Sequence, residues 1–142
     1  MAILVSAGLI NINQVVIDRL RMLHPATISE YDDGNGPVAW IILIPTTLDL
    51  MRSFVQGNIS EKDLFAMTMP GKQYDAIYLC SAMVLKEYRR KGFAKRLTLA
   101  AIDAIRKDHP IQALFVWAFS KAGDLGSENM AVLTSLPLYK RK

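Results

Sequence analysis

Three short, almost uninterrupted apolar runs constrain the fold of this chain more than any other feature. They occupy residues 38–44, 76–85 and 111–119, and each directly follows a proline or an aspartate. Apolar runs of this length are typical of strands that are covered on both faces of a sheet. Residues 2–10 have a similar composition and predict an opening strand. Since amphipathic stretches separate the runs, the chain is expected to fold as an α/β layered structure.

Helical patterns fill the intervals between these strands. A first stripe ends before Pro25 and consists of Ile12, Val16, Leu20 and Leu23. The most regular pattern spans residues 92–107, where apolar and charged residues lie on opposite sides of the expected helix. A short helix is also expected within residues 127–136. Residues 27–36 are interpreted as a loop, because acidic residues and glycines dominate them.

Residues 46–69 look helical as well, in two pieces. Thr46 or Thr47 can cap the first piece, and Gly57 can close it. Ser60 stands three positions before Asp63, which is a spacing related to the capping box that begins many helices. These residues therefore predict two helices between the second and third strands.

The composition is that of one ordinary globular domain, which we expect to span residues 1–142. With 51% hydrophobic and 21% charged residues, the chain is too apolar for a disordered tail. No stretch supplies the ~20 apolar residues that a membrane span needs, so no membrane partner is expected. The single cysteine, Cys80, excludes an internal disulfide and favours a reducing, cytoplasmic setting.

The net charge of +4 is unevenly distributed. Many of the bases crowd one window, namely Lys86, Arg89, Arg90, Lys91, Lys95, Arg96, Arg106 and Lys107. Part of this window forms a turn between an expected strand and an expected helix. The first turn of a helix has unpaired N–H groups and a partial positive charge, and both favour phosphate. Gly92 lets the backbone approach an anion closely, so the turn predicts a phosphate site.

The turn sequence Arg89-Arg90-Lys91-Gly92-Phe93-Ala94 resembles the pyrophosphate-binding motif of the GNAT superfamily of N-acetyltransferases, Arg/Gln-x-x-Gly-x-Gly/Ala. The preceding Val84-Leu85-Lys86-Glu87-Tyr88 is similar to the Val-x-Pro-x-Tyr segment of that family. The neighbouring strands and helix follow the family order, so the resemblance covers roughly residues 74–120. The helical residues 46–69 make the amino-terminal half atypical, and the carboxy-terminal end is short.

This resemblance implies a GNAT-like fold with a mixed, largely antiparallel central sheet flanked by helices and with a splayed strand pair. It also implies acetyl-coenzyme A as the acyl donor, bound without a metal, and direct attack by an amine in a ternary complex. The amides of the turn would hold the pyrophosphate, and strand backbone would pair with the pantetheine arm. The cofactor-binding residues implied in this way are Met83, Val84, Leu85, Arg89, Arg90, Lys91, Gly92, Phe93, Ala94 and Asn129.

Two tyrosines are candidates for proton transfer. Tyr139 would act as the general acid for the leaving thiolate, because a phenol has a pKa of ~10, close to that of a thiol. Tyr78 lies on the strand that leads to the acyl site, where some relatives place a carboxylate base; simple packing is its alternative role. His24 and His109 each precede a proline at an expected helix end, where capping of carbonyls is the usual role, and we expect no metal ligands. For Cys80 we expect packing.

Alternatives from other functional classes stay open. The first is a family relative that binds coenzyme A without catalysis. The second is a basic nucleic-acid-binding domain, which the sequence pI of about 9.3 supports. Only Tyr88 and Phe93 interleave the bases of the turn, which disfavours nucleic acid as a partner because a stacking platform needs more aromatic residues.

The acceptor is not fixed by the sequence. Small amines, peptide amino termini and protein lysines all stay open as small-molecule or peptide acceptors. Glu30, Asp32 and Asp33 could attract a cationic amine, although a solvated acidic loop is the simpler interpretation. The carboxy-terminal tail would return to the open edge of the sheet or to a partner subunit, so a homodimer also stays open.

Overall fold

The computed structural model of the chain describes residues 13–118 and 120–142. The strand expected in residues 2–10 lies outside the described residues. The helices are α1 (Gln14–Leu23), α2 (Leu48–Val55), α3 (Glu61–Met67), α4 (Phe93–Asp108) and α5 (Lys121–Thr134), with short 3-10 turns η1 (Pro25–Thr27) and η2 (Lys86–Tyr88). The strands are β1 (Ile28–Asp32), β2 (Pro37–Thr46), β3 (Ala76–Val84), β4 (Ala113–Val116) and β5 (Leu138–Lys140).

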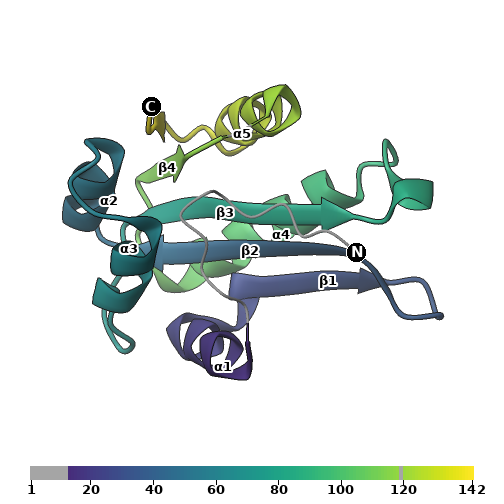
Figure 1. Cartoon of the computed structure of the whole chain (residues 1–142), viewed down its shortest axis with the longest axis horizontal. Helices are drawn as coiled ribbons and strands as arrows, with labels where there is room; N and C mark the ends of the chain where they lie inside the picture. Colours follow the sequence, from purple (N-terminus) through teal and green to yellow (C-terminus); the bar gives the residue numbers. More distant parts are fainter. Residues whose placement is uncertain (1–12, 119) are drawn as a thin grey trace.

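Among the described residues, these strands form one sheet in the order β1-β2-β3-β4-β5. The first three strands pair antiparallel, over five register positions between β1 and β2 and eight between β2 and β3. β4 is parallel to β3, and β5 is parallel to β4, over three positions each. The mixed, largely antiparallel sheet expected from the sequence is therefore confirmed (Figure 1).

The prediction of a loop over residues 27–36 is wrong. Residues 28–32 form β1, which pairs with β2 as a hairpin, and only residues 33–36 form the connecting loop. Among the described strands β1 lies at the edge of the sheet, and its second half is exposed, so it tolerates polar and charged residues that a central strand excludes. The acidic and polar composition of these residues therefore did not predict a strand.

β2 also extends further than predicted, because it continues through Pro45 to Thr46. The carbonyl of Thr46 accepts from the N–H of Asp75 on the β3 side, so the backbone nitrogen of Pro45 faces the opposite side. There the pairing with β1 has already ended, at Ile28 opposite Ile42. The missing N–H of the proline thus costs no ladder hydrogen bond.

The helix caps predicted from the sequence are present. The Thr47 side chain accepts from Leu50 N, and Gly57 follows α2 with a φ of 83°. Ser60 and Asp63 form the complete capping box of α3, in which each side chain accepts a backbone N–H of the other residue. The two predicted helices of residues 46–69 are therefore confirmed.

The carboxy-terminal part differs from the prediction in three ways. The ladder of β4 is only four residues long, whereas a strand was predicted over residues 111–119. α5 begins much earlier than the predicted 127–136, because Ser120 caps it by accepting from Gly123 N. The short strand β5 was not predicted, since its three residues carry no alternating pattern of their own.

Helices surround the sheet. In Figure 1, α4 lies behind it, α1 lies below β1, and α3 lies at the left-hand end of β2. The Arg19 side chain joins α1 to α3 by donating to the carbonyls of Ala66 and Thr68. The largest fully buried side chains include Phe54 and Phe115, so the core extends from α2 to the centre of the sheet.

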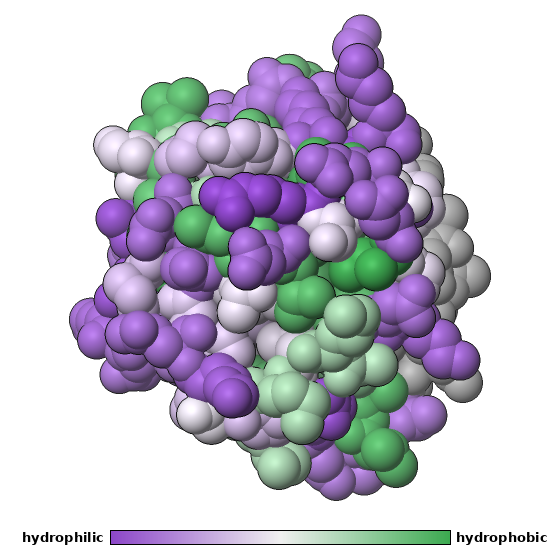
Figure 2. All heavy atoms as spheres, turned by 90° about the vertical axis from the view of Figure 1, so that its left-hand side faces the viewer, coloured by the Kyte–Doolittle hydropathy of each residue, from purple (hydrophilic) through white to green (hydrophobic). Residues whose placement is uncertain are grey.

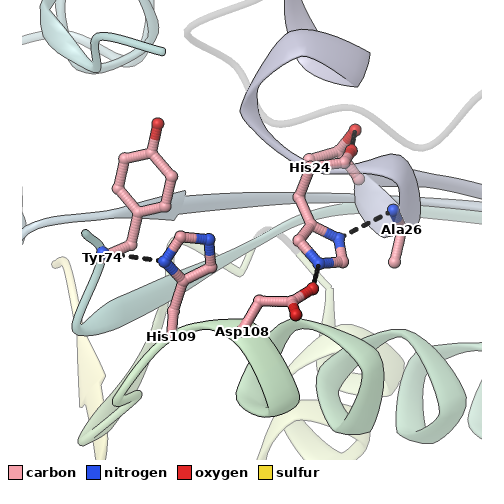
Figure 3. A network of polar contacts seen from close by, with 6 residues as sticks. His24, Ala26, Tyr74, Asp108 and His109 are labelled. Carbon is pink, nitrogen blue, oxygen red and sulfur yellow. Dashed lines mark hydrogen bonds and ion pairs between the residues drawn. The ribbon is translucent and has the colours of Figure 1, made fainter. Parts of the chain in front are cut away.

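A histidine pair, of which His24 is buried and His109 half-buried, ties α1 to the end of α4 (Figure 3). His24 Nδ1 accepts from Ala26 N at 3.0 Å, and His24 Nε2 lies 2.7 Å from a carboxylate oxygen of Asp108. His109, at the end of α4, accepts from Tyr74 N through its own Nδ1. Both histidines are the C-caps of their helices, as predicted: their backbone N–H groups donate to the carbonyls of Leu20 and Ile105. In addition, their side chains accept backbone N–H groups.

Candidate active site

The sheet opens between β3 and β4. Their parallel pairing ends at Tyr78 opposite Phe115, although β3 itself continues to Val84. Figure 1 shows β4 turning away from β3 toward α5. Beyond the last pair, the edge of β3 that faces β4 has no strand partner among the described residues. The splayed strand pair implied by the sequence is therefore present.

A β-bulge lies next to this opening. Leu79 and Ser81 of β3 pair with the consecutive residues Leu43 and Ile42 of β2, so Cys80 is the extra residue. A bulge bends its strand and increases the local twist. β3 therefore bends where it loses contact with β4.

Aromatic packing explains why β4 leaves β3. The rings of Tyr78 and Phe115 stack at the last pair, with centroids 5.0 Å apart. Trp117, two residues further along, packs instead against Phe54 of α2, and the guanidinium of Arg141 lies 4.3 Å above its ring. The chain after Phe115 therefore packs against α2 and the carboxy-terminal residues.

A pocket of about 550 Å³ fills the opening between the strands. Its walls come from the separated strands, from the first turns of α4 and from α5. They include Ser81, Met83, Val84, Arg89, Ala94, Thr98, Trp117, Gly126, Ser127 and Asn129. Most of its surface is apolar, and two of its lining residues, Arg89 and Lys95, place positive charge near the start of α4, so it suits an elongated ligand with one anionic end.

The basic turn, residues 86–94, forms the end of this site that suits an anionic group. Arg90 has a φ of 65° and Gly92 a φ of 78°, so two left-handed residues aim the chain into α4. The first intrahelical hydrogen bond runs from Arg96 N to Gly92 O. The N–H groups of residues 93–95 are therefore not used inside the helix, and they carry its positive dipole end. Such a helix start binds phosphate well.

Two arginines brace the turn from within. Arg89 Nε donates to the carbonyl of Val84 at 3.2 Å, and Arg96 Nη1 donates to the carbonyl of Lys91 at 2.9 Å. Arg106 belongs to the same basic window of the sequence, but it lies at the other end of α4 and donates to Thr134 O. The structure therefore divides the window into a basic turn and a separate carboxy-terminal group.

Comparison with known proteins decides the family of this fold. Residues 21–131 match the family model described as "Acetyltransferase (GNAT) family", which includes β1 to β4, the basic turn and part of α5. The chain belongs to the GNAT acetyltransferase family. No curated protein and no solved structure gives a significant match. The family and fold class inferred from the sequence are confirmed, and GNAT membership supports an acetyltransferase activity.

The structure gathers half of the predicted cofactor-binding residues at this GNAT pocket. Met83, Val84, Arg89, Ala94 and Asn129 line it. Asn129 comes from α5, 35 positions after Ala94 in the chain, so its place at the pocket depends on the fold.

The other predicted residues lie in or next to the basic turn without lining the pocket itself. Leu85 precedes η2, and Arg90, Lys91 and Gly92 form the approach to α4. The ring of Phe93 faces the β1–β2 hairpin, where it stacks on Tyr31. Their predicted roles toward a coenzyme stay predictions.

The pocket does not include either tyrosine proposed for proton transfer. Tyr78 is fully buried, and its hydroxyl donates to Glu61 Oε2 at 2.5 Å. Tyr139 lines a second pocket of about 390 Å³, together with Leu48, Arg52 and Gln112. In the register of β4 and β5, Tyr139 lies opposite Phe115 and so shares its face of the sheet. Their roles as catalytic groups stay predictions.

The second pocket belongs to the part of the molecule built around α2. Figure 2 looks onto the end that carries α2 and α3, where hydrophilic side chains surround smaller apolar patches. Arg52, one of the residues that line this pocket, is paired with Asp49 at 3.3 Å within the same helix. This ion pair gives the charge of Arg52 a partner within the protein, so the second pocket needs no anionic ligand.

Cys80 lies at the bulge and lines the main pocket, yet it is a poor nucleophile. Burial, with a smaller contribution from nearby Glu61, raises the pKa of its thiol well above the ordinary value. A thiol with a raised pKa holds little reactive thiolate at neutral pH. The packing role expected from the sequence agrees with this environment.

Sequence reasoning missed the contribution of α5 to the site. Gly123, Gly126 and Ser127 line the pocket, and all three are small. A Cβ added at Gly126 would meet no atom within 4 Å, so this glycine leaves open space at the pocket wall. Two glycines in one helix are unfavourable for helix formation, and that is the sequence signal that could have pointed to a ligand there.

Within residues 13–118 and 120–142, no group of three or more His, Cys, Asp or Glu side chains could hold a metal ion. None of the helices described there is long and apolar enough to cross a membrane.

Proposed function

We propose that this protein is an N-acetyltransferase that moves the acetyl group of acetyl-coenzyme A to an amine. Acetyl-coenzyme A combines a pyrophosphate, a long pantetheine arm with two amides, and a thioester. The proposal needs one continuous site for all three parts. The opening between β3 and β4, joined to the basic turn by a single pocket, is the observation that carries it.

Each part of the donor has a matching feature in this site. The start of α4 and the surrounding cations suit the pyrophosphate. The edge of β3 beyond Tyr78 offers backbone groups to which the pantetheine amides can bind, as a peptide binds when it extends a sheet. The thioester then reaches the gap beside the bulge at Cys80.

The reaction balances without another reactant. The nitrogen of a neutral amine forms a bond to the acetyl carbon, the carbon–sulfur bond breaks, and the nitrogen loses a proton while the thiolate gains one. The protein contributes mainly by holding the two reactants in attacking geometry. The cations of the turn hold the donor at its far end and leave the thioester exposed to the acceptor.

Binding and turnover can be measured separately. Isothermal titration of the full chain with acetyl-coenzyme A should show binding, and release of free thiol with a panel of small amines, peptides and lysine-rich proteins should show transfer. Binding without thiol release for any acceptor would favour the non-catalytic relative. Absence of binding would overturn the proposal and leave nucleic acid as the next ligand to try.

A variant of the basic turn sharpens this test. Arg90→Gly removes one cation but suits the left-handed backbone at this position. We expect it to weaken the binding of acetyl-coenzyme A by ~1–3 kcal/mol, with a smaller loss at high salt than at low salt. Lys107→Ala, at the far end of α4, removes the same charge as a control and should bind like the wild type.

A further inference from the structure

The tip of the β1–β2 hairpin lies against the basic turn, although the two segments are more than fifty residues apart in the chain. Four side chains make this hairpin–turn contact: Tyr31 and Asp33 from the hairpin, and Tyr88 and Phe93 from the turn. In Figure 1 the hairpin loop and the segment after β3 lie at the same end of the sheet. Nothing in the family motif accounts for the hairpin side of this contact.

The polar half of the contact is a hydrogen bond from the hydroxyl of Tyr88 to Oδ2 of Asp33. The other oxygen of Asp33 accepts from Asn35 N at 3.1 Å, which fixes the carboxylate within its own loop. The bond to Tyr88 is also the main reason why the pKa of Asp33 is lowered and that of Tyr88 is raised. Asp33 is therefore ionised at neutral pH and presents a fixed acceptor to the turn.

The apolar half of the contact is aromatic. The rings of Tyr31 and Phe93 stack with centroids 4.6 Å apart and planes 28° apart, and the ring of Tyr88 lies 6.0 Å from that of Phe93. Phe93 is the first residue of α4 and directly follows Gly92. The hairpin thus holds the turn at two points, before and after its two left-handed residues.

We propose that the hairpin is a positioning element for the coenzyme-binding turn, with Asp33 and Tyr31 as positioning residues. The inference rests on the proposed function, because it concerns the same site. A turn that contains left-handed Arg90 has other conformations available, since L-residues rarely adopt this backbone. By fixing Tyr88 and Phe93, the hairpin keeps the backbone N–H groups of the turn and of the first turn of α4 oriented toward one phosphate site. A pre-organised site loses less free energy of binding to ordering.

This role differs from ordinary structural packing because the contact lies at the surface. Tyr31 is 42% exposed, and Asp33 is exposed as well. Exposed contacts contribute little to the stability of a whole domain. Loss of the contact should therefore leave the melting temperature nearly unchanged and appear instead in ligand affinity.

The test is a comparison of coenzyme A affinities by isothermal titration with full-length variants. Asp33→Ala and Tyr88→Phe should each weaken binding by about 3- to 10-fold, the range expected when one ordinary, solvent-exposed hydrogen bond is lost. The double variant should be no weaker than the weaker single variant, because both changes remove the same bond. Asp33→Asn keeps an acceptor oxygen and should bind within about twofold of the wild type.

Glu30→Ala is the matched control. Glu30 is exposed on β1, three residues before Asp33, and its replacement removes the same negative charge from the hairpin. Both variants remove one negative charge and so change the long-range attraction of an anionic ligand in the same way. The difference in coenzyme A affinity between Glu30→Ala and Asp33→Ala therefore measures the effect of the Asp33–Tyr88 contact alone.

The outcomes separate this inference from the proposed function. If the wild type binds coenzyme A and the contact variants bind like Glu30→Ala, the hairpin has no positioning role, and the proposed function stands. If the wild type does not bind coenzyme A, both are overturned. Faster amide hydrogen exchange of residues 90–95 in Asp33→Ala, with an unchanged melting temperature, would support the positioning role directly.

Discussion

Gly92 starts α4 with a left-handed backbone, and Nη1 of Arg96 lies 3.0 Å from where a Cβ would stand. Two separate constraints therefore exclude a side chain here. The first is the backbone conformation, which L-residues adopt at a cost of about 1–2 kcal/mol. The second is the guanidinium that donates to the Lys91 carbonyl and braces the turn.

Gly92→Ala should weaken the binding of acetyl-coenzyme A roughly tenfold or more, because a loss of about 1.4 kcal/mol corresponds to one factor of ten. Gly71→Ala is a suitable control, since Gly71 has a nearly identical φ of 79° with open space around it. Both variants should melt at lower temperature than the wild type. Only Gly92→Ala should lose affinity in isothermal titration; equal affinities of the two variants would place the coenzyme elsewhere.

Tyr139 allows a direct test of the sequence-based assignment of the general acid. Its ring lines the pocket beside α2, not the one beside the basic turn, so the structure favours a wild-type kcat for Tyr139→Phe. If Tyr139 were the general acid, kcat would fall while affinity for acetyl-coenzyme A stayed nearly constant. Steady-state thiol release across pH 6–9, once an acceptor is found, distinguishes the two results.

At the level of secondary structure, Gly126 makes α5 less stable but keeps the wall of the pocket open. Gly126 lowers helix stability by about 1 kcal/mol relative to alanine. The same residue keeps the pocket wall free of side chains where the pantetheine arm of the proposed donor would pass.

A pair of variants separates these two effects. Gly126→Ala should raise the melting temperature, with a gain of up to about 1 kcal/mol in the free energy of unfolding, and should retain binding. Gly126→Leu should also fold, but its side chain would extend into the pocket and should abolish the binding of acetyl-coenzyme A. Thermal melting and isothermal titration of both variants provide the check, and a Gly126→Leu variant that binds normally would exclude this pocket as the pantetheine site.

The elements that the sequence predicted well are those whose signal is local. The turn from Arg89 to Ala94 and the caps at Thr47 and Ser60 depend on a few adjacent residues, and all of them have the expected local structure. β1 was missed because an exposed edge strand tolerates acidic residues. β4 was predicted too long because Trp117 is apolar for packing against α2, not for pairing with β3.

The pocket could be predicted only in part, because part of it depends on contacts between residues that are far apart in the chain. Its turn is contiguous in sequence, but its other wall comes from α5, whose position depends on long-range packing. Phe54 and Arg141, which pack against Trp117, lie 63 and 24 positions from it in the chain. No local pattern links these residues.

At the scale of the whole molecule, the contacts of His24 and His109 couple α1, α4 and the segment before β3 to pH. His109 must stay unprotonated at Nδ1 to accept from Tyr74 N. Burial is the main cause that lowers the pKa of His109 below the ordinary value of 6.5, and nearby His24 adds to it, while Asp108 opposes it. The folded protein therefore binds this proton less readily than the unfolded chain.

The sign of the pH effect follows from linkage. The contribution of His109 to stability is fully present above pH 6.5 and is lost as the pH falls through its lowered folded pKa. We expect the melting temperature to fall between pH 7 and pH 5, with His109→Gln showing a shallower decline than the wild type. The change amounts to at most about 1.4 kcal/mol for each unit of pKa difference. Parallel pH profiles of the two proteins would contradict the assignment.

The central claim is that one pocket, from the basic turn to the gap between β3 and β4, binds acetyl-coenzyme A. Amide hydrogen exchange of the full chain, with and without acetyl-coenzyme A, tests it most directly. The account predicts slower exchange in residues 81–96 and 120–130, with no change in residues 48–56 beside the second pocket. Protection confined to residues 48–56, or no protection anywhere in the chain, would contradict it.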